Sequence, residues 1–236
     1  MNRIVRWWRV TNSPSTSLPP STTSTSLKSH ARLPLILLGV LSLILLATAI
    51  APPAGRFNWV LEVGPGILGI VVLLSTYRKH PMSTLVYVCV FLHMLILNYG
   101  GYYTYAKAPL GDWMKPLLHA TRNHYDRIGH FALGLFPAII IREVLLRKTP
   151  LQRGGWLSFI VANICLSIGA FWELIEWWTT LLVAGNVGEA FLGSQGDIWD
   201  AQWDMFLVLI GGIVALIFLA RVHDRSMEKV PWPRNP

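Results

Sequence analysis

The chain has 236 residues, of which 53% are hydrophobic and 14% are charged. Its mean hydropathy of +0.47 lies outside the range of ordinary soluble domains, so the composition excludes a soluble globular protein and predicts an integral membrane protein. The net charge of +8 is typical of basic loops that hold one face of a membrane protein in the cytoplasm, and it does not indicate a nucleic-acid partner.

The first 33 residues differ from the rest of the chain. Three arginines flank the pair Trp7-Trp8, and a Ser/Thr/Pro tract follows over residues 11–29. Such a tract buries too little apolar surface to offset its conformational entropy, so we expect a disordered cytoplasmic tail over residues 1–33. The Arg/Trp cluster either contacts anionic lipid headgroups or is solvated. We expect no signal peptide, because the first apolar run begins late.

Six apolar segments follow, and most of them are near the ~20 residues that cross a ~30 Å hydrocarbon core. They are residues 34–50, 57–77, 82–105, 128–146, 156–183 and 205–222. We therefore expect an all-α fold, a bundle of six transmembrane helices over residues 34–222, and a cytoplasmic tail over residues 223–236.

Glycine, proline and cysteine add details to this bundle. The run Gly64-Pro65-Gly66 is expected to interrupt the second helix, and Gly211-Gly212 to let two helices pack closely. The two cysteines, Cys89 and Cys165, lie in apolar runs with no CxxC spacing. They are therefore expected to be small hydrophobic residues and not ligands or disulfide partners.

The basic residues predict the orientation of the bundle. Fifteen of the 20 Lys and Arg residues fall on one side of the six segments, and this bias predicts that both termini are cytoplasmic. Several tryptophans are expected near the opposite, outer boundary, where an aromatic belt would place them. They are Trp59, Trp113, Trp177, Trp178, Trp199 and Trp203.

The acidic residues have the opposite distribution, since nine of the 12 fall in the outer half of this layout. A spacing of three or four residues puts side chains on one face of a helix. Three motifs have this spacing and reach the same depth: Asp126 with His130, Glu173 with Glu176, and Asp197 with Asp200 and Asp204. Glu62 lies at a similar depth in the second segment. We expect these groups to converge.

Converging carboxylates repel one another unless they are protonated, paired with arginine or bridged by a cation. We expect a divalent metal ion, with Mg²⁺, Mn²⁺, Ca²⁺ and Zn²⁺ as the ions that suit oxygen ligands and one imidazole. The expected ligands are Asp126, His130, Glu176, Asp200 and Asp204. The expected catalytic residues are Glu173 or Asp197 as general base and Arg127, which would steady an anionic headgroup.

Structural alternatives stay open for the same residues. Asp126 and Asp197 are also placed to be helix N-caps. Glu173 and Glu176 lie near a helix C-terminus, where a negative charge is unfavourable. They therefore need a partner, and Arg122 or Arg127 is an alternative to a metal. Such pairs would form a purely structural network.

The motifs resemble a known family in three ordered places. Asp126-Arg-Ile-Gly-His130-Phe, Phe-Trp-Glu173-Leu-Ile-Glu176-Trp and Gly-Asp197-Ile-Trp-Asp200-Ala-Gln-Trp-Asp204-Met look like an uncharacterised family of bacterial inner-membrane proteins that includes YjdF. The resemblance covers residues 34 to about 227 and implies six helices and an inner-membrane location. The last three helices resemble, more distantly, the VanZ-like family. In its motif Arg127 replaces a lysine and Asp204 an asparagine.

Three functions are consistent with these observations. The first is a metal-dependent membrane enzyme, a hydrolase or transferase that acts on a lipid-linked or envelope substrate at the outer face. The second is a cation transporter or channel, with Glu62, His93, Asn98 and the interrupted second helix along the path. The third is a scaffold without catalytic activity that is held together by ion pairs at the outer face.

Overall fold

The computed structural model describes residues 21–183 and 193–230 of the chain. Its helices are α1 (Ser21–Ile50), α2 (Arg56–Thr76), α3 (Thr84–Tyr103), the short 3-10 helix η1 (Tyr105–Lys107), α4 (Pro109–Leu118), α5 (Tyr125–Lys148), α6 (Gly155–Leu182), α8 (Asp200–Phe218) and α9 (Ala220–Met227). The described residues contain no β-strand. The all-α prediction is confirmed.

Six of these helices contain a segment that is long and apolar enough to cross a membrane. The segments are Ala31–Ile50, Arg56–Thr76, Thr84–Tyr103, Tyr125–Lys148, Gly155–Leu182 and Asp200–Phe218. Each coincides with one of the six predicted segments. The prediction of a bundle of six transmembrane helices is therefore confirmed.

The helix boundaries differ from the prediction in three places. Helix α1 begins at Ser21, so residues 21–33 continue the first helix where we expected a disordered tail, and residues 1–20 lie outside the described part. Helix α2 runs without interruption through Pro65. A membrane helix tolerates an internal proline when neighbouring elements satisfy the freed backbone groups. The last span ends at Phe218, and the predicted tail begins inside α9.

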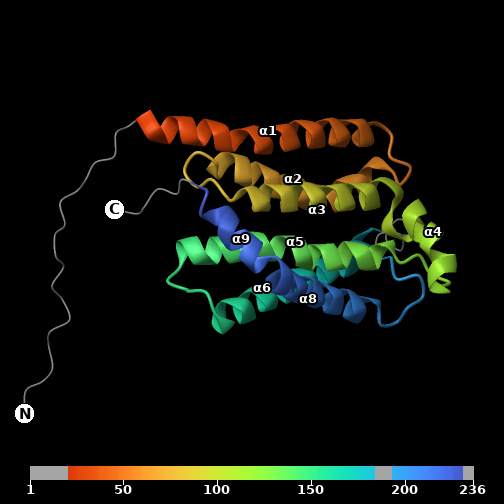
Figure 1. Cartoon of the computed structure of the whole chain (residues 1–236). Coiled ribbons are helices and arrows are strands. Elements are labelled where there is room, and N and C mark those ends of the chain that lie inside the picture. Colours follow the sequence, from red (N-terminus) through yellow and green to blue (C-terminus); the bar gives the residue numbers. More distant parts are fainter. Residues whose placement is uncertain (1–20, 184–192, 231–236) are drawn as a thin grey trace, which may run out of the picture.

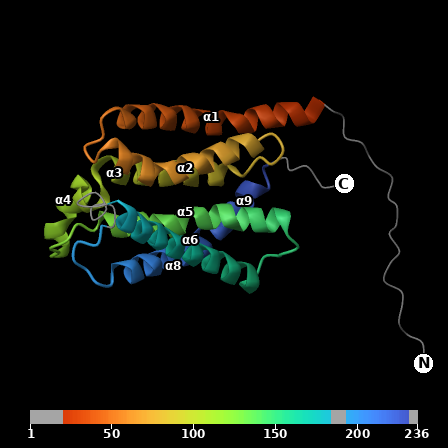
Figure 2. The same cartoon turned by 180° about the vertical axis from the view of Figure 1, so that it is seen from behind.

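The helices form two groups that meet at α3 (Figures 1 and 2). Helices α1 and α2 pack on α3, and α5 packs on α3, α6 and α8. Helix α4 lies at the end of the bundle where α5 and α8 begin, and α9 lies toward the other end (Figure 1). The three predicted acidic motifs lie in or beside α5, α6 and α8, so this second group positions them.

Two glycines set the distance between α5 and α8. A Cβ atom added at Gly134 would overlap the carbonyl oxygen of Val208, and one at Gly211 would overlap the carbonyl oxygen of Phe131. The two helix backbones therefore touch, and only glycine fits at these positions. The predicted role of Gly211 in close packing is confirmed, and Gly134 is its counterpart on the facing helix.

The main core lies where α3, α5, α6 and α8 meet. It contains Val86, Ile139, Val161 and Val208, none of which is exposed to solvent or lipid. Both cysteines lie in this core and are free. They are the small hydrophobic residues that the sequence predicts.

Candidate functional site

Six acidic residues, four of them buried, gather at the end of the bundle beside α4. We call this group the carboxylate cluster. It consists of Asp126 and His130 on α5, Glu173 and Glu176 on α6, Asp197 just before α8, Asp200 and Asp204 on α8, and Arg122 and Arg127. All the residues that the sequence nominated for the site are therefore at one end of the bundle.

Three residues at the centre of the carboxylate cluster form a triad that could hold a metal ion. Asp126, His130 and Asp204 are buried, and each offers one ligand atom within 4.8 Å of the other two. The Nε2 atom of His130 lies 3.4 Å from Oδ1 of Asp126, which confirms that the two side chains share a face. Asp204 comes from α8, and the contact of Gly134 with Val208 brings the two helices together.

Two arginines bind the acidic residues that lie nearest the loops. Arg122 Nη1 donates to Asp200 Oδ1 at 2.7 Å and to Asp197 Oδ2 at 3.2 Å. Arg127 Nη2 donates to Asp197 Oδ2 at 2.8 Å and to Asp200 Oδ1 at 3.1 Å. These bonds occupy Asp200, which the triad does not include. Arg127 Cζ also lies 5.7 Å from the ring centre of Trp203.

The glutamates of α6 have other partners than the predicted arginines. Glu173 Oε1 lies 3.6 Å from Nδ1 of His130, on the side of the ring opposite Asp126. Glu176 Oε1 accepts a hydrogen bond of 2.7 Å from Nε1 of Trp172. The shared face of the two glutamates is confirmed. Glu173 lies next to the triad, whereas Glu176 lies outside it.

Neither Asp126 nor Asp197 is a helix N-cap in the structure. The N-cap residue of α5 is His124, and Asp126 lies inside the first turn. The N-cap residue of α8 is Trp199. Asp197 precedes it and accepts a hydrogen bond from its backbone N–H at 2.9 Å. This bond, and then the nearby guanidinium groups of Arg127 and Arg122, lower the pKa of Asp197.

Three atoms at the centre of the cluster have no hydrogen-bond partner among the described residues. They are His130 Nδ1, Glu173 Oε1 and Asp204 Oδ1, and all three are buried. The nearest cationic group to Asp204 Oδ1 is Nε of Arg127, at 3.6 Å, which is too long for a hydrogen bond. A buried acceptor without a donor costs about 1–3 kcal/mol. These atoms could therefore accept a further partner, either a proton donor or a cation.

The loop that carries Arg122 is held by Asn123, which the sequence did not single out. Its side chain donates to Ala108 O at 2.9 Å and to Asp112 Oδ1 at 3.0 Å. Its backbone N–H donates to Gln195 Oε1 at 2.8 Å. The two loops at this end of the bundle are thus joined, and Arg122 is held next to Asp197 and Asp200. No spacing in the sequence indicates this pairing.

A second buried ionic group lies at the opposite end of the bundle, and we call it the arginine cluster. It consists of Arg142, Glu143 and Arg147 on α5, Arg153, and His223 and Asp224 on α9. Glu143 is fully buried and binds Ser83 N at 2.8 Å, Arg147 Nη2 at 2.8 Å and His223 Nε2 at 2.9 Å. The sequence analysis missed this group.

The hydrogen bonds of the arginine cluster fix the tautomer of its histidine. Nη1 of Arg142 lies 2.9 Å from Nδ1 of His223. Arginine only donates, so Nδ1 accepts and Nε2 carries the proton that is donated to Glu143. Arg142 also donates to Asp224 at 2.8 Å. Partial burial opposes ionisation of Asp224, but the bonds from Arg142 and Arg153 outweigh it and lower its pKa.

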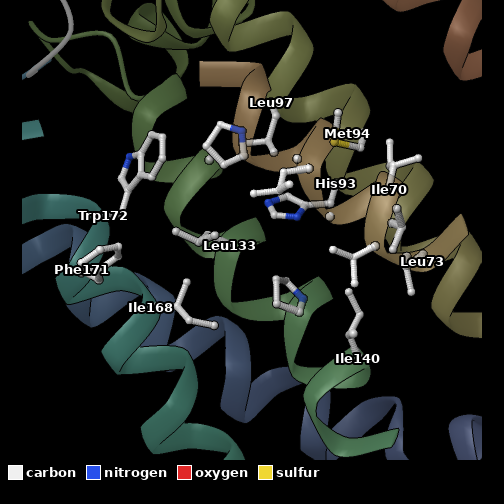
Figure 3. A pocket seen from close by; sticks show the side chains of 18 of the residues that line it. Ile70, Leu73, His93, Met94, Leu97, Leu133, Ile140, Ile168, Phe171 and Trp172 are labelled. Carbon is white, nitrogen blue, oxygen red and sulfur yellow. The ribbon is translucent and has the colours of Figure 1, made fainter. Parts of the chain in front are cut away.

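A cavity of about 780 Å³ lies between the two clusters, and α2, α3, α5 and α6 line it. We call it the membrane groove. Glu62, Asp126, His130 and Glu176 line one end, and His80, Arg147 and Lys148 the other. Figure 3 shows apolar side chains between the ends, among them Leu97, Leu133 and Ile168.

The path predicted for a transported cation is only partly assembled. Glu62 and His93 line the same groove, and Figure 3 shows His93 among its apolar side chains. Asn98 instead accepts hydrogen bonds from Thr48 and from Nε1 of Trp59. Trp59 is therefore buried, unlike the rest of the predicted belt. The exposed members are Trp113, Trp177, Trp178, Trp199 and Trp203.

Comparison with known proteins places this architecture in a family. Residues 33–225 match the family described as "Predicted membrane protein (DUF2238)". The chain belongs to the DUF2238 family. It is 43% identical over 189 residues to the inner membrane protein YjdF of Escherichia coli (strain K12), an alignment that covers 80% of this chain and 90% of YjdF. No solved structure matches the chain.

The DUF2238 match agrees with the six apolar helices, so the protein is a multi-pass inner membrane protein. The resemblance to an inner-membrane family that includes YjdF is confirmed. The more distant resemblance to the VanZ-like family stays a prediction. The family match spans α2, α3, α5, α6 and α8 completely and so includes both ionic clusters and the groove.

Proposed function

We propose that the carboxylate cluster binds a divalent cation through Asp126, His130 and Asp204. The observation that carries this proposal is the buried triad with ligand atoms within 4.8 Å of one another. Asp204 Oδ1 and His130 Nδ1 have no hydrogen-bond partner among the residues described. Carboxylate oxygens with one imidazole suit Mg²⁺, Mn²⁺, Ca²⁺ or Zn²⁺.

The charge balance of the cluster supports a cation. Six carboxylates share the cluster with two guanidinium groups, and both guanidinium groups are bound most closely to Asp197 and Asp200. The remaining carboxylates stay close together in a buried region, where like charges interact strongly. A divalent cation at the triad would neutralise the part of the cluster that the arginines approach only at 3.6–3.9 Å, without a hydrogen bond.

The chemistry that follows is hydrolysis or group transfer on a lipid-linked or envelope substrate. The cation would polarise the bond to be cleaved. In hydrolysis, the oxygen of a water molecule would bond to the electrophilic atom while a proton of the water passes to Glu173. The bond from the electrophilic atom to the leaving oxygen would break, and Glu173 would return the proton to that oxygen. Glu173 suits this role better than Asp197, because two arginines bind Asp197. Arg127 would steady the anionic group.

The orientation of the site follows from the basic residues. Fifteen of the 20 Lys and Arg residues fall on the side opposite the carboxylate cluster. By the positive-inside rule both termini would be cytoplasmic, and the cluster would open toward the periplasm. This side suits an envelope substrate.

A cation titration of the purified protein tests the proposal. Protein freed of divalent ions should be stabilised against thermal unfolding by at least one of Mg²⁺, Mn²⁺, Ca²⁺ and Zn²⁺, by about 2.7 kcal/mol at a hundred times its Kd. Asp204→Asn should abolish this gain, because it removes a ligand charge. Asp224→Asn, in the arginine cluster, is the matched control and should keep it.

The titration also separates the competing functions. A wild-type protein that none of the four cations stabilises, or an Asp204→Asn variant that responds like the wild type, would contradict the cation site. If Asp204→Asn lowers stability without any effect of cations on either protein, the cluster is a structural ion-pair network and the protein is a scaffold.

A further inference from the structure

The membrane groove opens sideways, between helices, toward the surrounding bilayer. Helix α2 packs on α3, whereas α6 packs on α5 and α8, and the groove lies between these two groups. Two residues of its rim, Leu68 on α2 and Phe171 on α6, are exposed at the surface of the helices. Both rim positions lie within spans that cross the membrane. The groove is therefore accessible from the bilayer.

The walls of the groove favour a hydrocarbon occupant. Between its two ends they are formed by aliphatic and aromatic side chains such as Leu97, Leu133 and Ile140 (Figure 3). A water-filled groove with such walls would leave their apolar surface in contact with water, which is unfavourable. A lipid chain that enters from the bilayer would fill the same space with hydrocarbon, which is apolar like the walls.

One end of the groove coincides with the candidate cation site. Asp126 and His130, two members of the triad, also line the groove. Glu62 and Glu176 line the same end, and all four side chains are buried. A chain in the groove would thus place its polar headgroup against the residues proposed to bind the cation.

We propose that the membrane groove holds the acyl chain of a membrane phospholipid, with the phosphate at the cation held by Asp126, His130 and Asp204. The position of the phosphate rests on the proposed function, whereas the seat of the chain does not. Divalent cations commonly bridge protein carboxylates and phosphate oxygens. Without a cation the carboxylates would repel the phosphate, so the headgroup and the cation bind together.

The length of the groove agrees with this placement. Its lining runs along α5 from Asp126 to Lys148, a distance of about 33 Å at ~1.5 Å per residue. One leaflet contributes about half of a ~30 Å hydrocarbon core. A chain whose phosphate lies at Asp126 would therefore end near Pro137 and Ile140, about halfway along.

The opposite placement would use side chains that already have partners. A phosphate at the other end would lie near Arg147 and Lys148, but Arg147 Nη2 lies 2.8 Å from Glu143 and Lys148 Nζ lies 2.9 Å from Nε2 of His80. A chain of the same length would again end near the middle of the groove. The two placements therefore predict different contacts for the phosphate end of the lipid.

Phospholipid retention tests the seat of the chain. Full-length protein purified in mild detergent and incubated with phosphatidylglycerol and Mg²⁺ should retain one phospholipid in native mass spectrometry. Tryptophan at the groove wall should expel it, in Ile168→Trp on α6 and, as a second variant, Leu68→Trp on α2. The matched controls are Ile213→Trp and Leu46→Trp, which lie outside the groove.

These controls match the groove residues in type and exposure. Ile168 and Ile213 are 36% and 37% exposed, and Leu68 and Leu46 are 64% and 68% exposed. Loss of the phospholipid in both groove variants, with retention in both controls, supports the proposal. Equal retention in all four variants, or no retention by the wild type, overturns it. The groove variants should still respond to cations, so a failed cation titration and a failed groove are distinguishable.

Photolabelling tests the direction of the chain. A phosphatidylglycerol with a diazirine near its carboxyl ester should label residues around Glu62 and Trp172, and one with a diazirine at the end of the chain should label residues around Ile140 and Leu73. Labelling around Arg147 and Lys148 by the first lipid would show that the phosphate lies at the basic end and would overturn the proposed placement. Labelling near Glu62 should fall in Asp204→Asn. Undiminished labelling there would overturn the contact between phosphate and cation.

Discussion

The carboxylate cluster and the arginine cluster bury ionisable side chains at opposite ends of the same helix, α5, but their charges are balanced differently. In the arginine cluster Glu143 has three close partners, all within 2.9 Å. In the carboxylate cluster the central contacts of His130 are 3.4 Å and 3.6 Å long. Both oxygens of Glu143 have close partners, whereas Oε1 of Glu173 and Oδ1 of Asp204 have no hydrogen-bond partner among the described residues.

This difference separates a structural from a functional role better than burial does. A buried charge is costly unless it is paired and hydrogen-bonded. Glu143 at the centre of the arginine cluster meets this requirement with partners from the protein, and these bonds join α5 to α9 and to the residue before α3. The carboxylate cluster meets it only in part, which is typical of a site whose last partner is a ligand.

The largest expected effect is the loss of the central carboxylate of the arginine cluster. Glu143→Gln should lower the free energy of unfolding by about 3 kcal/mol, because Arg147 would keep its place without a buried counter-charge and His223 would lose its charged acceptor. Denaturant unfolding in detergent micelles measures the change. Glu228→Gln, at an exposed position near the end of α9, is the control and should change stability by less than about 0.5 kcal/mol. Equal effects of the two substitutions would contradict a structural arginine cluster.

A glutamate-to-glutamine substitution in the carboxylate cluster should have a smaller effect and should not lower stability. In protein freed of divalent ions, Glu173→Gln should leave the free energy of unfolding unchanged or raise it by about 1 kcal/mol, since Oε1 of Glu173 has no hydrogen-bond partner in the described part of the chain and the charge it removes is repelled by its neighbours. A loss of stability as large as that of Glu143→Gln would show that Glu173 is a structural partner of His130 and would contradict its proposed role as general base.

The smallest expected effect concerns pH. The pKa of Asp224 is lowered in the folded protein, so its ionised form contributes stability above the unfolded pKa of about 3.9. That contribution is lost as the pH falls through the lower folded pKa. Because Asp224 is partly exposed, we expect about 0.5 kcal/mol. Asp224→Asn should therefore reduce the loss of unfolding free energy between neutral and acidic pH, as measured by denaturant unfolding at several pH values. An unchanged pH dependence would show that the bonds from Arg142 and Arg153 contribute nothing to stability.

The sequence predicts the features that depend on local spacing. The six spans follow from the length of apolar runs, and the convergence of the three acidic motifs follows from helical periodicity and the rise per residue. These arguments placed Asp126, Glu173 and Asp204 at one depth, where the structure has them. They could not say which of the acidic residues face an arginine.

The remaining features depend on contacts between distant segments. Arg122 lies in a loop, and its position depends on the bonds of Asn123 with Gln195, which is 72 residues away. Glu143 and His223 are 80 residues apart, and neither belongs to a recognisable motif. Asp126 and Asp200 are both aspartates with helical spacing to other acidic residues. Only Asp126 belongs to the triad, because Arg122 and Arg127 bind Asp200.

The contact between Gly134 and Val208 also bears on which ion the triad can accept. Two helix backbones in contact cannot move closer. Gly211 lies in the same interface between α5 and α8, and a shift of one helix along the other would bring larger side chains into this contact. His130 lies one turn from Gly134, and Asp204 one turn from Val208, so main-chain contact fixes the spacing of the backbone segments that carry these two side chains. For a cation bound as proposed, this fixed spacing would favour one ionic radius over another. Mg²⁺ binds at 2.0–2.1 Å and Ca²⁺ at about 2.3–2.6 Å, so this interface would make the protein selective between cations of equal charge.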